Sequence, residues 1–236
     1  MSVQQSEIRN YLLSKIPHPE FARLAEHLEP VSLPQGCIIA APGQPFTHVY
    51  FPESGIGSVL VVSPEGNKAE AGLFGRDGFS PTVALTGSDT SLHEIIMQVA
   101  GAGHRVPTNV FEQLLTETDG AKSILDNFAH ALGTQVSFTA LSNAIHPVDE
   151  RLARWLLMVH DRSDGDEMAL THEFLSVMLA VRRPTVTTSL HVLEGNGFIR
   201  AERGYITIRD RRALEEFARD AYGKPEEEYR RLLGTP

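Results

Sequence analysis

Residues 170–199 read LTHEFLSVMLAVRRPTVTTSLHVLEGNGFI, a pattern that predicts two short helices separated by a tight turn. Thr171 suits the N-cap of the first helix, because its hydroxyl can accept a hydrogen bond from a free backbone N–H. The turn is expected at residues 180–182, and Pro184, which has no N–H, suits the first position of the second helix. The predicted inward-facing residues are Phe174, Leu175, Met178, Leu179, Val186, Leu190 and Leu193. This layout is that of a helix-turn-helix.

The second helix, about residues 183–193, combines positive charge and hydroxyl groups at its N-terminus. Free N–H groups and a partial positive charge already favour phosphate at a helix N-terminus. Arginine can also contact guanine through two hydrogen bonds, and threonine can contact a base edge or a phosphate. We therefore predict base contacts from Arg183 and Thr188. The residues predicted to contact phosphate are Arg182, Thr185, Thr187, Arg200 and Arg203.

Charge is distributed unevenly along the chain. The net charge of −9 and the isoelectric point near 5.6 exclude a protein that coats nucleic acid indiscriminately. Residues 180–209 nevertheless carry +3, whereas residues 1–145 carry −7. Residues 198–210 are expected to form two strands joined near residues 202–204, which is the wing of a winged helix. The local charge favours a DNA-binding domain, and the alternative is the same domain used for protein contacts.

An antiparallel β-structure is predicted upstream, over residues 31–105. Clusters of turn residues recur there about every ten positions, which is typical of a β-sandwich or barrel. Two short helices, interrupted by Pro17 and Pro19, are expected before it in residues 6–27. The fold class is therefore α+β, with a β-rich N-terminal domain and a helical C-terminal domain.

A long amphipathic helix is predicted over residues 119–143, because apolar residues recur there at spacings of three and four. We interpret its apolar stripe as a dimer interface formed by Leu125, Phe128, Leu132 and Val136. A helix packed along its own domain would show the same spacing and remains the alternative. His146 precedes a proline and ends the helix, so a hinge is expected at residues 144–148. A second amphipathic helix follows at residues 148–162.

The C-terminal segment, residues 210–236, is expected to form one helix followed by a charged tail. The sequence leaves open whether this helix packs on the winged domain or on a partner subunit.

Together, the β-rich block, the long helix and the winged helix-turn-helix resemble the Crp/Fnr family of bacterial transcription regulators. The resemblance covers nearly the whole chain and is most specific over residues 147–208. It implies a jelly-roll sensor domain of the cyclic-nucleotide-binding type at residues 1–118. It further implies a dimerisation helix and hinge at residues 119–146, and a winged helix-turn-helix domain with a C-terminal helix at residues 147–236.

The resemblance also implies partners: a second copy of the chain, double-stranded DNA with a palindromic sequence, and RNA polymerase. The half-sites would lie about 34 Å apart on one face of the DNA. Arg183, Thr185 and Val186 match the family's recognition pattern Arg-Glu-Thr-Val. Pro184 replaces the glutamate and Thr188 replaces a second arginine one turn later, so the half-site sequence is expected to differ. Whether the protein activates or represses stays open.

The sensor domain departs from the family members that bind cyclic AMP. Those members carry a Gly-Glu-Leu turn and an Arg-Ser or Arg-Thr pair for the cyclic phosphate, whereas this chain has His93-Glu94 at the position of that pair. Since glutamate repels phosphate, we expect neither cyclic AMP binding nor a resident cofactor. Another effector, or none, remains open. The candidate effector pocket is formed by Gly75, Arg76, Asp77, Gly78 and Glu94.

The sequence gives little support to a disulfide-bonded, iron–sulfur, metal-binding or enzymatic protein. Cys37 is the only cysteine, which excludes an internal disulfide and a four-cysteine iron–sulfur cluster. A cupin-like metal set of Gly43, His48 and Glu53 lacks its second histidine, because Tyr50 stands there. The sequence contains no hydrolase or nucleotide-binding glycine motif, so we expect no metal site and no enzymatic activity.

Residues 1–10 are polar and no apolar run is long enough to span a membrane, so we expect a cytoplasmic protein without membrane contact. The alternative function is an effector-binding or protein-interaction module whose helix-turn-helix no longer reads DNA specifically.

Overall fold

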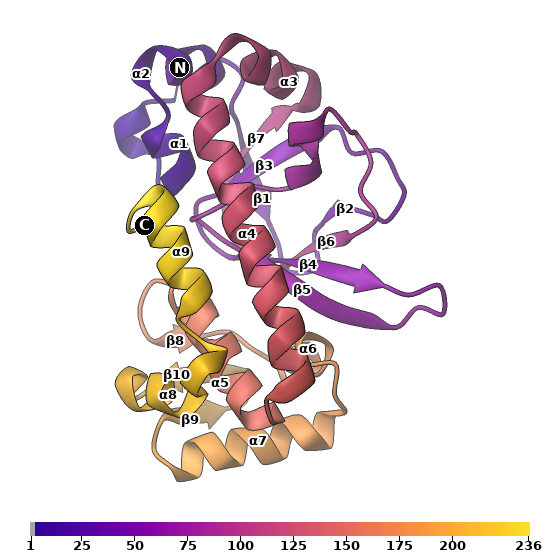
Figure 1. Ribbon diagram of the computed structural model, residues 1–236, viewed down its shortest axis with the longest axis vertical. Helices are drawn as coiled ribbons and strands as arrows, with labels where there is room; N and C mark the ends of the chain where they lie inside the picture. The colour runs from indigo at the N-terminus through magenta and orange to yellow at the C-terminus, as the bar shows by residue number, and fades with distance from the viewer. Residues whose placement is uncertain (1–2) are drawn as a thin grey trace.

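Two antiparallel sheets form the N-terminal part of the computed structural model, which describes residues 3–236 (Figure 1). One sheet has the order β1-β7-β3 and the other has the order β2-β6-β4-β5. The strands are β1 (Glu29–Leu33), β2 (Ile38–Ala40), β3 (His48–Pro52), β4 (Ile56–Val62), β5 (Lys68–Phe74), β6 (Glu94–Val99) and β7 (Gly101–Pro107). The predicted β-rich domain is confirmed. The first two residues of the polar N-terminal stretch lie outside the described residues.

Turn chemistry explains why the strands end where they do. Gly55, between β3 and β4, has a φ of 81°, and a side chain there would overlap the carbonyl oxygen of Val99. Only glycine fits both conditions. Gly36, Gly43, Gly66 and Gly87 also have positive φ and lie between strands, as the clusters of turn residues predict, whereas Gly101 and Gly103 lie within β7.

Short helices flank the sheets: η1 (Gln5–Glu7), α1 (Tyr11–Lys15), α2 (His18–Ala25), η2 (Thr82–Thr86) and α3 (Thr108–Glu117). The two predicted short helices are confirmed as α1 and α2, and the break between them falls at Ile16 and Pro17. Pro19 lies in the first turn of α2 and does not interrupt that helix. Phenylalanines link β3 to the helices: the ring of Phe51 in β3 stacks on Phe79 with centroids 5.6 Å apart. Phe79 in turn lies 5.8 Å from Phe111 and 5.5 Å from Phe128.

The long helix α4 (Asp119–Ile145) packs its apolar face on its own β-domain. Leu125, Phe128 and Leu132 are at most 8% exposed within the chain. Val136 is half-buried and lies beside Gly72 of β5. The interpretation of this face as a dimer interface is therefore wrong, and the alternative of packing within the domain is confirmed. The spacing of apolar residues alone could not distinguish a dimer interface from packing within the domain, because both require the same periodic apolar stripe.

The C-terminal part contains a second, mostly helical domain. Its elements are α5 (Val148–His160), β8 (Glu167–Met168), α6 (His172–Met178), α7 (Arg183–Gly195), β9 (Ile199–Glu202), β10 (Tyr205–Ile208), α8 (Arg211–Ala218) and η3 (Arg219–Ala221). The three strands form a sheet with the order β8-β10-β9, and β8 was not expected from the sequence. Ile56, Leu60 and Leu73 of the β-domain belong to the core of this domain, so the two domains are packed together.

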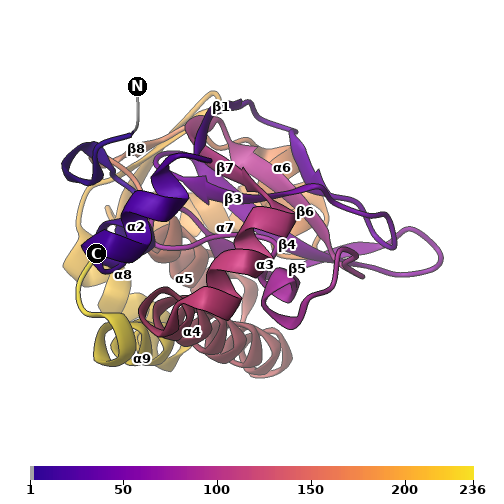
Figure 2. The ribbon, with the colours of Figure 1, turned by 90° about the horizontal axis from the view of Figure 1, so that it is seen from above.

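The last helix, α9 (Lys224–Leu233), forms where a charged tail was expected. The backbone N–H of Gly223 donates to the Glu226 side chain over 2.9 Å, which caps the helix. The chain then returns to the N-terminal domain, where α9 lies beside α4 (Figures 1 and 2). Tyr229 and Leu233 are buried in that domain's core, although the predicted boundaries placed residues 147–236 in one domain. Among residues 3–236, none of the helices has the length and apolarity that crossing a membrane requires.

Candidate nucleic-acid interface

The helix-turn-helix prediction is confirmed by α6 and α7. Phe174 N donates to Thr171 Oγ1 over 3.2 Å, so Thr171 is the N-cap. Ala180 takes a left-handed conformation with a φ of 50°, which turns the chain between the helices. Helix α7 begins at Arg183, and Pro184, predicted at the first position, lies one residue later in the first turn. The seven residues predicted to face inward are at most 7% exposed.

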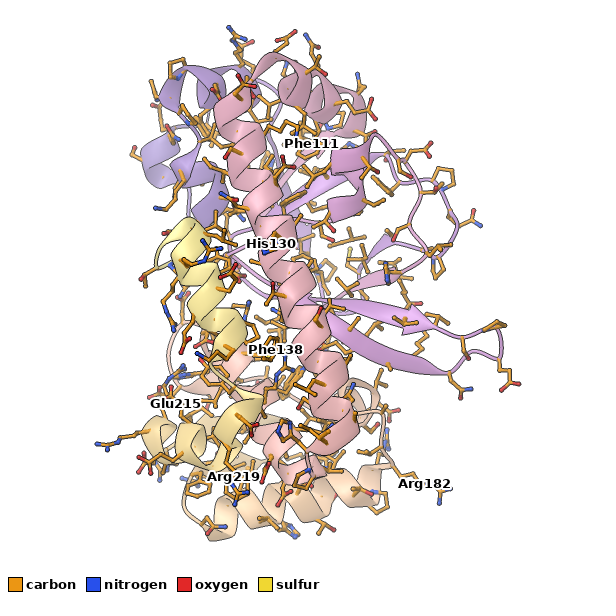
Figure 3. The ribbon with its side chains drawn as sticks, in the orientation of Figure 1. Phe111, His130, Phe138, Arg182, Glu215 and Arg219 are labelled. Atoms are coloured by element: carbon orange, nitrogen blue, oxygen red, sulfur yellow. The ribbon has the colours of Figure 1, made fainter. Side chains whose placement is uncertain are left out.

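The other face of α7 is open to solvent. Arg183, Thr185, Thr188 and His191 are exposed, and Thr187 is half-buried. Arg182 extends away from the end of α7 in Figure 3. The structure thus brings together all five predicted contact residues of the helix end.

Two threonines on α7 use their hydroxyl protons within the helix. Thr187 Oγ1 donates to the carbonyl of Arg183 over 3.2 Å, and Thr188 Oγ1 donates to the carbonyl of Pro184 over 3.1 Å. Their oxygen lone pairs remain available as acceptors. In this state Thr188 suits a base amino group, whereas a phosphate, which only accepts, would require the hydroxyl to rotate.

The arginines of this surface differ in their pairing. Arg183 forms an ion pair with Glu173 of α6, and Arg200 Nη2 lies 2.6 Å from Glu202 Oε1 on β9. Arg182 and Arg203 form no ion pair within residues 3–236. Both pairs are more than half exposed, and such pairs contribute only about 0–1 kcal/mol. They therefore do not prevent Arg183 or Arg200 from turning to DNA.

A groove of about 730 Å³ joins α7 to the wing formed by β9 and β10. Arg183 and His191 line it from α7, and Arg203 lines it from the wing. His172 of α6 also lines it, with its Nδ1 3.1 Å from Thr187 Oγ1. Neither histidine was among the predicted contact residues. The three-residue spacing from Thr188 to His191 is the signal that places His191 on the same helix face.

The five residues predicted as an effector pocket do not surround one cavity. Arg76 Nη1 lies 2.6 Å from Asp164 Oδ1, and the Gly78 position is covered by the ring of Phe128. Glu94 pairs with Lys68 over 2.7 Å, at the far end of β5. Gly75 N donates to Asp77 Oδ1 over 2.8 Å, so these two residues stabilise their own turn. Residues from the C-terminal domain neutralise the turn, which the linear sequence does not show.

Two smaller cavities lie between the domains. One of about 180 Å³ lies between α4 and α9 and is lined by residues including Asp77, Phe128, Leu132, Gln135, Arg162 and Tyr229. The other, of about 230 Å³, is lined by Glu53, Arg76 and Asp164 among others. Across the described part of the chain, no group of three or more His, Cys, Asp or Glu side chains could hold a metal ion. The cupin-like residues are separated, because His48 faces Glu29 whereas Glu53 accepts from the backbone of Arg9.

A buried carboxyl group lies in the contact between the domains. Glu70 Oε1 accepts from Trp155 Nε1 over 2.8 Å, and Glu70 Oε2 accepts from Ser58 Oγ over 2.7 Å. Burial raises the pKa of Glu70 to about 7, although both donors and nearby Arg154 and Arg162 oppose this rise. Burial likewise lowers the pKa of Arg154, whose Nε has no hydrogen-bond partner in residues 3–236.

Comparison with known proteins identifies the architecture. Residues 150–217 match the model of the Crp-like helix-turn-helix domain. A comparison with curated protein sequences gave no match.

Solved structures share the fold over most of the chain. FixK2 from Bradyrhizobium japonicum superposes with a TM-score of 0.69 at 16% identity, over 81% of this chain and 98% of that one. TTHA1359, a Crp/Fnr-family transcriptional regulator from Thermus thermophilus, gives 0.62 at 23% identity, over 80% and 98%. The c-di-GMP responsive global regulator CLP from Xanthomonas campestris gives 0.63 at 16% identity, over 81% and 99%. These likenesses show the fold, and the resemblance predicted from the sequence is confirmed.

Proposed function

We propose that this protein, which has the Crp/Fnr fold and a Crp-like helix-turn-helix domain, is a sequence-specific DNA-binding transcription regulator. The observation that carries the proposal is the open N-terminus of α7, where Arg182 and Arg183 are exposed and Arg183 shares a groove with Arg203 of the wing. Helix α7 would enter the major groove with its first turn at the base edges. Arg183 would then contact guanine, and Thr188 would accept from a base amino group.

We further propose that the protein acts as a homodimer on a palindromic site. The outer face of α4 carries small residues, Gly133, Ser137 and Ala140, followed by Leu141 and Ile145. Leu141 is 47% exposed and Ile145 is 59% exposed, which leaves apolar surface uncovered at the end of α4. Small residues allow a second helix to approach closely, and the two apolar residues supply area to bury. This face replaces the inner face as the proposed dimer contact.

We propose the cavity between α4 and α9 as the binding site of a small-molecule effector. Asp77 of the N-terminal domain and Arg162 of the C-terminal domain both line it, so a ligand there would contact both domains. A ligand shifts a conformational equilibrium only when it binds one arrangement better than another. We also propose that the protein contacts RNA polymerase, and this proposal rests on the family resemblance.

The test of the proposed function is selection of bound fragments from random DNA with the full-length protein. We expect an inverted repeat whose half-sites lie about one helical turn apart. Arg183→Ala should lose the enriched sequence, and Arg212→Ala should keep it, because Arg212 is an equally charged residue on exposed α8. Recovery of the same sequence by both variants would contradict the assignment of Arg183.

A protein-interaction module is the second candidate, and it is favoured by three acids in the groove, Glu173, Glu194 and Glu202. Acidic side chains repel the DNA backbone. In that case neutralising Arg183 and Arg203 together would leave both DNA affinity and its salt dependence unchanged. For a DNA reader the affinity falls and the salt dependence becomes shallower.

A further inference from the structure

We propose that Asp77 is a positioning residue that fixes the C-terminal domain, residues 148–221, against the N-terminal domain, and that α9 is the clasp that completes this contact. The consequence for DNA binding rests on the proposed function, whereas the contact itself does not.

Asp77 is held from two sides by the C-terminal part of the chain. Its Oδ1 accepts from Arg162 Nε over 3.0 Å, and its Oδ2 lies 2.7 Å from Arg162 Nη2. Its backbone carbonyl accepts from the Tyr229 hydroxyl over 2.7 Å. Asp77 is 4% exposed, so this two-point pair is shielded from solvent. Removing one partner would leave a buried charge without compensation, which is strongly unfavourable.

The turn that carries Asp77 is fixed from its own side as well. Gly75 N donates to Asp77 Oδ1 over 2.8 Å, and Tyr11 N donates to the carbonyl of Arg76 over 2.7 Å. The ring of Phe128 covers Gly78. A turn with this many restraints cannot follow a moving partner, so its carboxylate is a fixed point for Arg162.

Helix α9 connects the C-terminal domain to the N-terminal domain through the chain itself. It follows α8 directly through η3, and it packs along α4 in the N-terminal domain. Tyr11 Oη donates to the carbonyl of Leu233 over 3.0 Å, and Glu228 lies 3.4 Å from His130. His130 lies on α4 facing α9 in Figure 3. Rotation of the C-terminal domain would therefore break the Asp77–Arg162 pair and strain the connection from η3 to α9.

A more exposed ion pair beside Asp77 provides the matched control. Asp164 lies 2.6 Å from Arg76 and 2.7 Å from Arg9, and it also joins the two domains, but its side chain is 61% exposed. Exposed pairs contribute little, so Asp164→Asn removes a contact between the same domains without leaving a buried charge.

The experiment compares full-length Asp77→Asn, Tyr229→Phe and Asp164→Asn proteins by thermolysin cleavage at the hinge and by affinity for the selected DNA. Thermolysin cleaves before apolar residues, and the predicted hinge, residues 144–148, contains Ile145 and Val148. We expect Asp77→Asn to raise the cleavage rate at the hinge about tenfold or more, because cleavage follows the population of the open form. Tyr229→Phe should raise it less, and Asp164→Asn should leave it within about twofold.

The DNA arm measures the consequence for function. Asp77→Asn should weaken binding to the selected sequence about fivefold or more. When the C-terminal domain can reorient freely, only the fraction of molecules in the binding-competent orientation can bind DNA. A failure of the proposed function would abolish specific DNA binding in the unaltered protein and leave the cleavage result intact, so the two failures are distinguishable. If Asp77→Asn does not fold, Arg162→Lys takes its place, since lysine keeps the charge and loses the two-point geometry. If the folded variant is cleaved at the hinge at the same rate as the unaltered protein, the proposal is overturned.

Discussion

Replacing Glu70 by glutamine should make the stability of the protein less sensitive to pH. Glu70 lies on β5 in the buried contact with α5, where it accepts from Trp155 and Ser58. Glutamine keeps the size of the side chain, and its carbonyl oxygen can still accept from Trp155. Its amide group can donate to the Ser58 hydroxyl, which rotates to accept. The substitution therefore removes a titrating group with little change in packing.

The magnitude follows from the pKa of Glu70 in the folded and unfolded chain. Its ordinary value is 4.5, and burial raises the pKa to about 7 in the folded protein. Because the folded-state value is the higher one, the contribution of Glu70 to stability is complete below pH 4.5 and is lost as the pH rises through 7. The loss reaches about 3 kcal/mol at pH 8, compared with about 1 kcal/mol at pH 5.

Urea unfolding of Glu70→Gln and of the unaltered protein at pH 5 and pH 8 measures this effect. The free energy of unfolding of the variant, relative to the unaltered protein, should rise by about 2 kcal/mol between the two pH values. Glu65→Gln, in the exposed turn after β4, is the control and should show no such rise. Equal differences at both pH values would refute the reasoning, because Glu70 would then be ionised in the folded state at pH 5.

Three further predictions concern the DNA surface, the dimer and the core. Arg203→Ala should weaken binding to all DNA sequences alike and lower the slope of log affinity against log salt by about one, measured by fluorescence anisotropy. Leu141→Glu should convert dimers to monomers in sedimentation analysis, whereas Lys122→Glu, at the other end of α4, should not. Leu190→Ala should reduce the free energy of unfolding by about 2–5 kcal/mol, because Leu190 is buried between α7 and its domain. The same change at exposed Val192 should cost less than about 1 kcal/mol in urea unfolding.

The helix-turn-helix could be predicted almost residue by residue, because local chemistry determines it. Thr171 caps a helix wherever its neighbours are helical, and Pro184 favours a first turn regardless of the rest of the chain. The spacing of Val186, Leu190 and Leu193 admits only one buried face on a helix.

The contacts around the turn at residues 75–78 could not be predicted in this way. Arg76 and Asp77 have the charges of a ligand site, but their partners Asp164 and Arg162 lie far along the sequence. Nothing in a single sequence states which distant charge will neutralise which. Helix α9 was missed for a similar reason: its position depends on packing beside α4, a contact that its charged sequence does not show.

At the end of α4, the proposed dimer contact and the predicted hinge lie beside η3, the segment that leads into α9. Leu141 and Ile145 are exposed there, immediately before His146. His146 Nδ1 lies 3.1 Å from Ser142 Oγ, and its Nε2 lies 3.2 Å from Asp220 of η3, the segment that leads into α9. A partner helix that packs on Leu141 and Ile145 would therefore restrain the residue that touches η3. If the proposed dimer forms on this face, we expect the contact between His146 and Asp220 to link dimer formation to the position of η3.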